Sequence, residues 1–345
     1  MALDTVVTEP DFEATHGRTG WIISDGKTGM DVQTRGVFDA LGLDYEIKRV
    51  DPAGIFKMLS PYGPVSPAER FGTETSQFCP PWPDFAISVG RLTTPYIRRL
   101  KRLAGRRTYT VILQDPGVST AAADLFSVPE HDRLRGPNVI TTLTAPHSFT
   151  PRRLAELRRA MPPDIAALPV PRVAVLLGGP DGSYRYTKPA LARLVTALNS
   201  LSGLRAGLMI TPSRRTPAQV SAFVRDGTEG KPRLFWSGTG DNPYPHFLAH
   251  ADLLITPGDS VNMVGEACAT GKPVYIFAPD GGGAPKRRHF HAALARHGAA
   301  RPLPLRFERL ETWSYAPLNS AETIAAEIVR RWVNYSQIFG PASRP

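Results

Sequence analysis

The sequence of 345 residues contains two cysteines, and no apolar run in it approaches the roughly 20 residues that a membrane-spanning helix requires. Cys79 and Cys268 stand far apart and lack metal-ligand spacing, which argues against a disulfide framework or a zinc site. Residues 1–20 lack both the apolar core of a secretory signal and the basic amphipathic pattern of a transit peptide. We therefore expect a cytoplasmic protein whose residues 1–19 form a flexible tail.

Acidic side chains are outnumbered, with 31 Asp and Glu against 41 Lys and Arg, for a net charge of +10. Such an excess favours anionic partners, among them nucleotides, nucleic acid and acidic lipid headgroups. The basic residues are dispersed and not interleaved with aromatics on one element, so we expect no nucleic-acid partner. The basic cluster from Arg98 to Arg107 is also consistent with peripheral binding to anionic lipids at the inner face of the membrane.

Short apolar runs alternate with segments of helical periodicity along most of the chain. This alternation predicts an α/β fold of parallel sheets covered by helices, arranged as two Rossmann-like domains whose sheets face a central cleft. In such an arrangement, ligands bind at the carboxyl ends of the strands. The predicted strands are residues 21–24, 45–50, 85–89, 109–113 and 139–143, followed by 173–177, 206–210, 233–236, 253–256 and 273–277.

Residues 162–171 are rich in proline and alanine and mark the expected junction between the two domains. We predict an N-terminal Rossmann-like domain over residues 20–165 and a C-terminal Rossmann-like domain over residues 170–318. Residues 319–345 contain a final helix, which we expect to pack back on the N-terminal domain.

The most informative segment is DLLITPGDSVNMVGEACATGKPVYIF, residues 252–277, which reads as a strand, a Gly-Asp-Ser turn, a helix and a second strand. A helix N-terminus just past the carboxyl end of a parallel strand suits a phosphate, because it offers unpaired N–H groups and a positive dipole end. Glu266 lies where its carboxylate would accept two ribose hydroxyls. The alternative is that Asp259 or Ser260 simply caps the helix.

Three other loops follow predicted strands. In TPSRRTP, the guanidinium groups of Arg214 and Arg215 could bind a diphosphate, with hydroxyl donors from Ser213 and Thr216. An equal alternative is that the two arginines are a solvated surface pair and Thr216 caps the next helix. The loop from Ser237 to Tyr244 is a candidate for holding the base, and Gly178 and Gly179 permit close backbone approach or form an ordinary turn. The predicted nucleotide site comprises Gly178, Gly179, Ser213, Arg214, Arg215, Thr216, Ser237, Asn242, Tyr244, Gly258, Asp259, Ser260, Val261, Asn262, Met263 and Glu266.

The order of these segments resembles the mitochondrial-fission Elm-type (elongated mitochondria) family, from about Trp21 to Phe290. The segments that carry the resemblance are DGKTGMDVQTRGVFDALGL, PPWPDFAISVGR, QDP, VPEHD, NVITTLTAPH, VAVLLGGPDGSYRY, ITPSRRTP, DNPYPHFLAHADLLITPGDSVNMVGEACATGKPVYIF and Lys286. The resemblance implies a GT-B-like fold whose C-terminal half is similar to nucleotide-sugar domains. Bacterial members are described as glycosyltransferases or, loosely, as nucleoside-diphosphate-sugar epimerases, whereas plant members recruit a dynamin-like protein to mitochondria.

Three positions depart from the pattern that the resemblance leads us to expect. Gly265 stands where a serine is expected, Pro257-Gly258 reads as an insertion before Asp259, and Gly117 follows QDP where an arginine is usual. A changed side chain at such a position alters donor or acceptor preference, so the substrate does not carry over from relatives.

On the acceptor side, the GKTG turn after the first strand provides Gly26, Lys27 and Gly29, with Gln33 close behind, unless it is only a tight strand-to-helix connection. A transferase that inverts the sugar needs a general base for the acceptor hydroxyl. The candidate catalytic residues, each just after a predicted strand, are Asp25, Asp115 and His147.

The sequence thus predicts a nucleotide-sugar-dependent glycosyltransferase with an unknown acceptor, lipid-linked or belonging to the envelope. No Asp-x-Asp cluster follows a strand, and arginines with a helix dipole can meet the leaving-group charge, so we predict no metal and no cofactor besides the sugar-nucleotide co-substrate. A non-catalytic adaptor that keeps the fold is the alternative. An epimerase is a third hypothesis, although WIISDGKTGMD lacks the G-x-G-x-x-G of a dinucleotide-dependent one.

Overall fold

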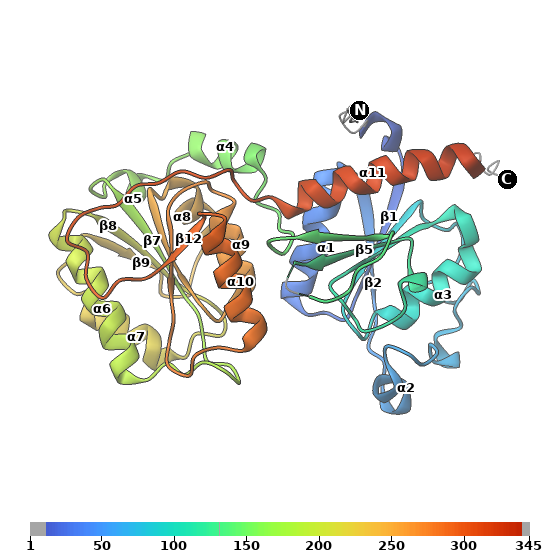
Figure 1. Cartoon of the computed structure of the whole chain (residues 1–345), viewed down its shortest axis with the longest axis horizontal. Helices are drawn as coiled ribbons and strands as arrows, with labels where there is room; N and C mark the ends of the chain where they lie inside the picture. The colour runs from blue at the N-terminus through green and yellow to red at the C-terminus, as the bar shows by residue number, and fades with distance from the viewer. Residues whose placement is uncertain (1–11, 131, 340–345) are drawn as a thin grey trace, which may run out of the picture. The chain divides into compact units, whose positions relative to one another are not determined.

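The computed structural model describes residues 12–130 and 132–339, and the chain divides into two compact units (Figure 1). Unit 1 comprises residues 1–148 and 320–345, and unit 2 comprises residues 149–319. Most of the predicted tail, residues 1–11, lies outside the described residues. Within the rest of it, Phe12–Thr15 forms the 3-10 helix η1, and the first strand begins at Thr19.

Unit 1 contains a six-stranded sheet in the order β2-β1-β3-β4-β5-β6, and every pair of neighbours is parallel. Its strands are β1 Thr19–Ser24, β2 Asp44–Arg49, β3 Phe85–Val89, β4 Tyr109–Leu113, β5 Leu125–Pro129 and β6 Val139–Thr142. Its helices are α1 Thr28–Leu41, α2 Gly54–Leu59, α3 Thr94–Ala104 and α11 Ser320–Phe339, with 3-10 turns η2 Pro67–Glu69, η3 Gly105–Arg107 and η4 Thr120–Ala122.

Both faces of this sheet are buried, as a parallel sheet with covering helices requires. Side chains alternate along each strand, so Ile22 joins the core under α1 and α11, whereas its neighbours Trp21 and Ile23 join the core on the other face, which contains residues of α3. The C-terminal helix α11 contributes Ile324 and Ile328 to the first of these cores. The last helix of the chain is therefore an integral part of unit 1.

Unit 2 contains the second six-stranded parallel sheet, in the order β12-β11-β10-β7-β8-β9. Its strands are β7 Arg172–Leu177, β8 Gly207–Pro212, β9 Arg233–Phe235, β10 Leu253–Pro257, β11 Val274–Phe277 and β12 Ala300–Pro302. Its helices are α4 Pro151–Arg159, α5 Pro163–Ala166, α6 Lys188–Gly203, α7 Ala218–Gly227, α8 Tyr244–His250, α9 Val261–Cys268 and α10 Pro285–Arg296.

The predicted α/β class with two Rossmann-like units is confirmed. The division between the units differs from the predicted one, because the first segment of unit 1 ends at Ser148 and not at residue 165. The reason is that α4 packs on α8: Arg158 Nε donates to the Ala249 carbonyl at 3.0 Å, and His250 Nε2 lies 3.1 Å from the Leu157 carbonyl. Within the described ranges, no helix is long and apolar enough to cross a membrane.

Candidate functional site

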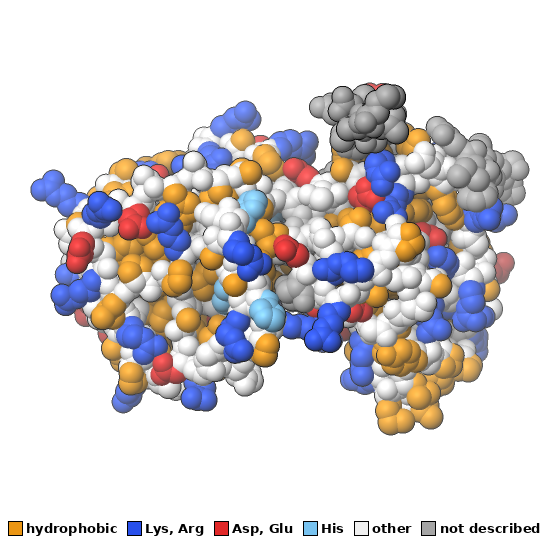
Figure 2. All heavy atoms as spheres, in the orientation of Figure 1, with side chains coloured by type: hydrophobic (Ala, Val, Ile, Leu, Met, Phe, Trp, Pro, Cys, Tyr) orange, Lys and Arg blue, Asp and Glu red, His pale blue; other side chains and the backbone are white. Residues whose placement is uncertain are grey.

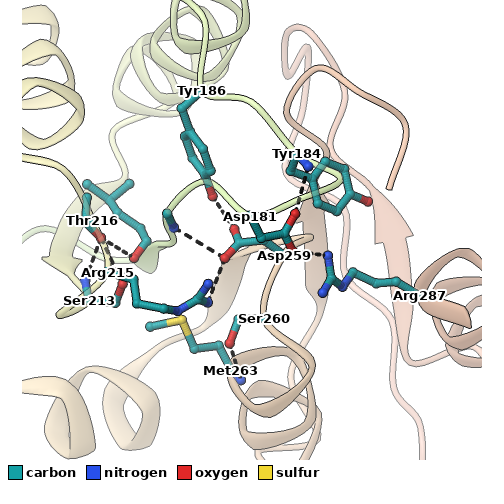
Figure 3. Close-up of polar contacts among 12 residues, drawn as sticks. Asp181, Tyr184, Tyr186, Ser213, Arg215, Thr216, Asp259, Ser260, Met263 and Arg287 are labelled. Atoms are coloured by element: carbon teal, nitrogen blue, oxygen red, sulfur yellow. Dashed lines mark hydrogen bonds and ion pairs between the residues drawn. The ribbon is translucent and has the colours of Figure 1, made fainter. Parts of the chain in front are cut away.

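The predicted nucleotide-sugar residues of unit 2 lie on loops at the carboxyl ends of its strands. Because β7 pairs with both β8 and β10, and β10 also pairs with β11, four of these ends are neighbours along one edge of the sheet. The loops after β7, β8 and β10 meet around one carboxylate, that of Asp259 (Figure 3). The Asp259 side chain therefore lies at the centre of the candidate site.

The carboxylate of Asp259 is fully buried and has three partners. Arg215 Nη2 lies 2.8 Å from Oδ2, the Gly179 N–H donates to the same oxygen at 3.3 Å, and the Tyr186 hydroxyl donates to Oδ1. Burial and this neighbouring charge raise the pKa of Tyr186. A buried carboxylate without partners would be strongly destabilising, so these contacts both fix Asp259 and tie three loops together.

Arg215 is held at one nitrogen, while its side chain remains about half exposed, at 51%. Asp259 thus sets the position of a guanidinium whose other donors remain available. Glycine is required on either side of this contact. A Cβ at Gly178 would lie 2.1 Å from Asp259 Oδ1, and one at Gly179 would lie 2.1 Å from the Arg215 carbonyl. The close approach at these glycines is therefore between loops of the protein itself.

Ser213 and Thr216 close the β8 loop on itself. The Ser213 N–H donates to Thr216 Oγ1 at 2.8 Å, the two hydroxyl oxygens are 3.0 Å apart, and Thr216 Oγ1 donates to the Leu177 carbonyl at 2.8 Å. The alternative that Thr216 caps the next helix is wrong, since α7 begins at Ala218 with Pro217 at the N-cap and no side-chain cap. Arg214, next to Arg215, is exposed.

Ser260 caps α9, because its hydroxyl accepts a hydrogen bond from the Met263 N–H at 3.3 Å. The cap alternative therefore holds for Ser260, while Asp259 anchors the loops instead. Val261 and Asn262 complete the first turn of this helix. At Gly258, a Cβ would lie 3.1 Å from the Phe277 carbonyl and 3.3 Å from the Tyr184 hydroxyl, so the turn before α9 is tightly packed.

Glu266 is buried within unit 2 and accepts a hydrogen bond from the Tyr244 hydroxyl. Burial raises the pKa of Glu266 to about 7, although the Tyr244 hydrogen bond and the charge of Arg153 oppose that shift. Tyr244 donates to one carboxyl oxygen, Oε2, so the predicted ribose hydroxyls would have to reach the other oxygen of this buried group. Its ribose role stays a prediction.

The predicted base loop is held by its own turns. The Asn242 side-chain oxygen accepts a hydrogen bond from the Tyr244 N–H at 3.1 Å, as an Asn-Pro turn favours. The Ser237 and Thr239 hydroxyl oxygens are 2.9 Å apart and exposed. Asn242 thus supports the start of α8, and binding of a base by this loop stays a prediction.

A second set of polar contacts, which the sequence analysis did not predict, joins the β7 loop to α10. Asp181 accepts the Ser183 N–H at 2.7 Å and the Tyr184 N–H at 2.8 Å, and it pairs with Arg287. Burial raises the pKa of Asp181, but these hydrogen bonds outweigh it and bring the pKa to about 2. In the sequence, the Asp-Gly-Ser turn after β7 could have indicated the role of Asp181. Nothing in the sequence indicated its partner Arg287, which lies on α10 over a hundred residues away.

In unit 1 the predicted acceptor residues follow β1. Asp25 pairs with Lys27, and its side chain is 5% exposed. Gly26 has a φ of +82°, a left-handed value that suits glycine, and Gly29 lies in the first turn of α1. Gln33 of α1 accepts a hydrogen bond from the Gln114 side chain at 3.0 Å, which links α1 to the loop after β4.

Of the other two candidate bases, Asp115 accepts the Gly117 N–H at 2.8 Å in a local turn, whereas His147 is 1% exposed. A side chain buried to that degree does not reach an acceptor hydroxyl without rearrangement. Its backbone packs against Gly36, where a Cβ would lie 2.5 Å from the His147 carbonyl carbon. By the same measure Asp25, whose side chain is 5% exposed, would also have to rearrange, so the geometry favours Asp115, which is partly exposed.

An unpredicted polar cluster also lies at the end of β1. Arg49 Nη2 is 2.8 Å from Asp31 Oδ2, Arg49 Nη1 donates to Ser24 Oγ at 2.7 Å, and the Ser24 hydroxyl donates to Asp31. This cluster fixes the start of α1 against β2. Over residues 12–130 and 132–339, no group of three or more His, Cys, Asp or Glu side chains is placed to hold a metal ion.

Comparison with solved structures agrees with this architecture. UDP-GlcNAc 2-epimerase from Methanocaldococcus jannaschii, in complex with UDP-GlcNAc and UDP, is 13% identical with a TM-score of 0.50, covering 92% of this chain and 99% of that one. The glycosyltransferase SnogD from Streptomyces nogalater is 14% identical with a TM-score of 0.50, covering 93% of this chain and 98% of that one. The likeness shows a GT-B-like fold.

Sequence comparison identifies the family. The Mitochondrial fission protein ELM1 of Arabidopsis thaliana is 30% identical over 272 residues, which are 72% of this chain and 64% of the Arabidopsis protein. This chain therefore spans less than two thirds of that relative. The family profile described as Mitochondrial fission ELM1 matches residues 28–332, which confirms the resemblance drawn from the motifs. The chain belongs to the mitochondrial fission ELM1 family.

Proposed function

We propose that the protein is a nucleotide-sugar-dependent glycosyltransferase, with unit 2 binding the nucleoside diphosphate of the donor. One observation carries this proposal: the half-exposed guanidinium of Arg215 is fixed by the fully buried carboxylate of Asp259. A cation positioned before the ligand arrives suits a developing diphosphate leaving group. The fold likeness supports the assignment, since one similar structure contains UDP-GlcNAc and UDP and another is a glycosyltransferase.

In this proposal the diphosphate lies between Arg215 and the first turn of α9. That turn offers backbone N–H groups and the positive end of the helix dipole. Together they supply fixed positive potential, so neither a metal nor a further cofactor is required for the leaving group. Gly178 and Gly179 serve by letting the β7 loop pack against Asp259 and Arg215.

For the chemical step, Asp25 or Asp115 takes the proton of the acceptor hydroxyl. The acceptor oxygen forms a bond to the anomeric carbon as the bond from that carbon to the diphosphate oxygen breaks, and the electron pair leaves with the nucleoside diphosphate. Lys27, which pairs with Asp25, offers a charge to an anionic acceptor. If the step runs this way, Asp25→Asn or Asp115→Asn lowers turnover about 10²- to 10⁴-fold while leaving donor affinity intact.

The first experiment is a calorimetric and thermal-shift screen of nucleoside diphosphates and their sugars. A ligand at 100 times its dissociation constant stabilises the folded state by about 2.7 kcal/mol, a shift that is readily measured. Charge-assisted hydrogen bonds contribute about 1.5–3 kcal/mol, so Arg215→Ala weakens binding roughly 10- to 150-fold. Arg152→Ala in α4 of unit 2 is the matched control, with the same lost charge on a side chain that is 90% exposed and outside the predicted site. If no member of the panel binds, the proposal is wrong.

A non-catalytic adaptor that retains the fold is the second candidate. The observation that favours it is that Asp259 and Glu266, two residues predicted to face the ligand, are satisfied by other side chains of unit 2. Such an adaptor binds protein partners and does not turn over any sugar nucleotide. Nucleotide binding without release of nucleoside diphosphate, across a range of sugar donors and acceptors, would support it against the transferase.

An epimerase is distinguished by the same assay. Absence of G-x-G-x-x-G argues only against a dinucleotide-dependent epimerase, and the fold likeness includes a UDP-GlcNAc 2-epimerase. An epimerase converts its sugar nucleotide with no acceptor present. A sugar nucleotide that is epimerised under those conditions, with the diphosphate bond intact, would replace the transferase assignment.

A further inference from the structure

Exposed apolar side chains gather at one place on unit 1, in residues 54–65, a segment that we call the α2 tip. Of the nine exposed large hydrophobic side chains among the described residues, four lie in this segment: Ile55, Met58, Leu59 and Tyr62. Met58 and Tyr62 are 71% and 69% exposed, and Figure 2 shows hydrophobic side chains gathered over α2. Single exposed apolar residues are ordinary, but a contiguous group of them marks an interaction site.

Helix α2 does not contribute to the core, since all six of its residues are described and none of them is buried, whereas Val65 at the end of the α2 tip packs against the core. The α2 tip is nevertheless held in place. Arg98 Nη1 donates to the Pro61 carbonyl at 3.0 Å and to the Tyr62 carbonyl at 2.9 Å, and the Tyr62 hydroxyl donates to the Gly117 carbonyl at 2.8 Å. The apolar side chains are therefore presented on a braced element that the fold itself does not need for burial.

Charge selects among the partners that an apolar tip would fit. Residues 54–65 contain Lys57 and no acidic residue. Two arginines adjoin them: Arg98 holds the turn, and Arg91 Nη2 lies 3.4 Å from the Lys57 carbonyl. The carboxylate of Asp115 lies beyond Gly117 and accepts the Gly117 N–H. An apolar tip flanked by three cations is complementary to a surface that has hydrocarbon beneath a layer of phosphates.

We propose that the α2 tip docks the protein on an anionic lipid bilayer, with Ile55, Met58, Leu59 and Tyr62 entering the interface and Lys57, Arg91 and Arg98 near the headgroup phosphates. A tyrosine suits that depth because it has an apolar body and a polar end. The proposal does not depend on sugar transfer, because it uses a segment outside the predicted donor and acceptor residues. It also predicts that the neighbouring Asp115 loop lies close to the membrane surface.

Vesicle co-sedimentation tests the proposal. We expect the full chain to bind vesicles of phosphatidylcholine with one third phosphatidylglycerol, to bind pure phosphatidylcholine far less, and to dissociate at high salt. Replacing both Ile55 and Met58 by serine lowers the partition coefficient at least about 100-fold, since each fully inserted side chain contributes about tenfold or more. Lys57→Gln lowers it about fivefold. Leu305→Ser is the matched control: Leu305 is as exposed as Ile55, at 58%, and lies in unit 2, so binding is unchanged.

A second readout reports insertion directly. Met58→Cys in a Cys79→Ser background, labelled with an environment-sensitive fluorophore, shifts its emission to the blue on anionic vesicles, whereas Leu305→Cys in the same background does not. Failure of the wild type to bind anionic vesicles at low salt would overturn the proposal, as would full binding by the double serine variant. Self-association in sedimentation that the double variant abolishes, without vesicle binding, would assign the α2 tip to a protein contact instead. Donor titrations of the same variants remain unchanged, which separates this result from the proposed transferase.

Discussion

The two units have the same six-stranded parallel sheet, but they treat the loops after their strands differently. In unit 2 the loops are tied to one another: Asp259 links those after β7, β8 and β10, and Asp181 with Arg287 links the β7 loop to α10. In unit 1 the contacts of Asp25 and Asp115 stay within their own loops. Gln33 of α1 accepts a hydrogen bond from Gln114 in the β4 loop, and Arg49 at the end of β2 contacts Ser24 and Asp31 at the end of β1 and the start of α1.

This difference has a physical meaning. Interlocked loops with buried charges hold their donors in place before a ligand binds, which lowers the reorganisation needed for a diphosphate. Loops with local contacts adapt at low cost, as an acceptor of variable structure requires. Unit 2 thus has fixed loops after its strands, whereas the loops after β1 and β4 of unit 1 are more adjustable. Each of the following changes tests that contrast.

The largest effect is expected when the centre of the unit 2 loops is removed. Asp259→Ala leaves Arg215, Tyr186 and the Gly179 N–H without their shared acceptor, so we expect about 3–5 kcal/mol of destabilisation. Asp25→Ala in unit 1 breaks one local pair with Lys27, whose side chain is 59% exposed, and costs no more than about 1 kcal/mol. Urea denaturation of both variants measures the two costs. Equal costs would show that the loops of unit 1 are as firmly tied as those of unit 2.

The next largest effect is a pH dependence of the unfolding free energy that comes from Glu266. Folded Glu266 keeps its proton up to about pH 7, whereas an unfolded glutamate loses it near 4.5, so the folded state binds more protons between these values. Stability from this group is therefore lost as pH rises from about 4.5 to 7, by on the order of 3 kcal/mol. Glu266→Gln, which stays neutral, removes that part of the slope.

Unfolding free energies at pH 5 and pH 7.5 check this prediction. The exposed Glu74→Gln in unit 1 serves as the charge-matched control and leaves the slope of the wild type unchanged. Because other groups also titrate in this range, the measured quantity is the difference between the slopes of variant and wild type. A Glu266→Gln slope equal to that of the wild type would contradict the assigned burial of this carboxyl.

A smaller effect is expected from packing between the loops. Gly178→Ala places a methyl group where Asp259 Oδ1 now lies, so the β7 loop has to move, at a cost of about 1–3 kcal/mol. Gly182→Ala, four residues further along the same loop, meets nothing within 4 Å and is the control. Donor affinity falls with the first change and not with the second. If both variants match the wild type, the loop contact is not rigid.

Much of the fold could be predicted from the chain itself. The strands β3 and β4 have the predicted bounds, because each is a fully buried run of apolar, β-rich residues with clear breaks on both sides. Strands β5 and β12 were missed. Only a short 3-10 turn precedes β5, and β12 has three residues, so neither has the strand-then-helix alternation on which the prediction rested.

The site was predictable only in part. Sequence reasoning placed the important loops, since polar residues after parallel strands converge at one edge of a sheet. It did not predict which side chains pair, because the partners are far apart in the chain: Tyr186 reaches Asp259 across 73 positions, and Tyr244 reaches Glu266 across 22. Such pairings follow from packing, which no local pattern encodes. The same holds for the roles of Gly178 and Gly179, whose neighbours come from other loops.

The smallest effect is expected at the link between α1 and the β4 loop of unit 1. Gln33→Ala removes the acceptor of a neutral hydrogen bond of 3.0 Å from Gln114, which contributes about 1 kcal/mol. Tyr186→Phe in unit 2 also removes one hydrogen bond, but to a buried carboxylate, and costs about 1.5–3 kcal/mol. Hydrogen exchange of α1 and the β4 loop, read beside urea denaturation, shows whether the loss stays local. Were Gln33→Ala to cost as much as Tyr186→Phe, unit 1 would hold its loops as rigidly as unit 2, and the contrast between the two units would have to be given up.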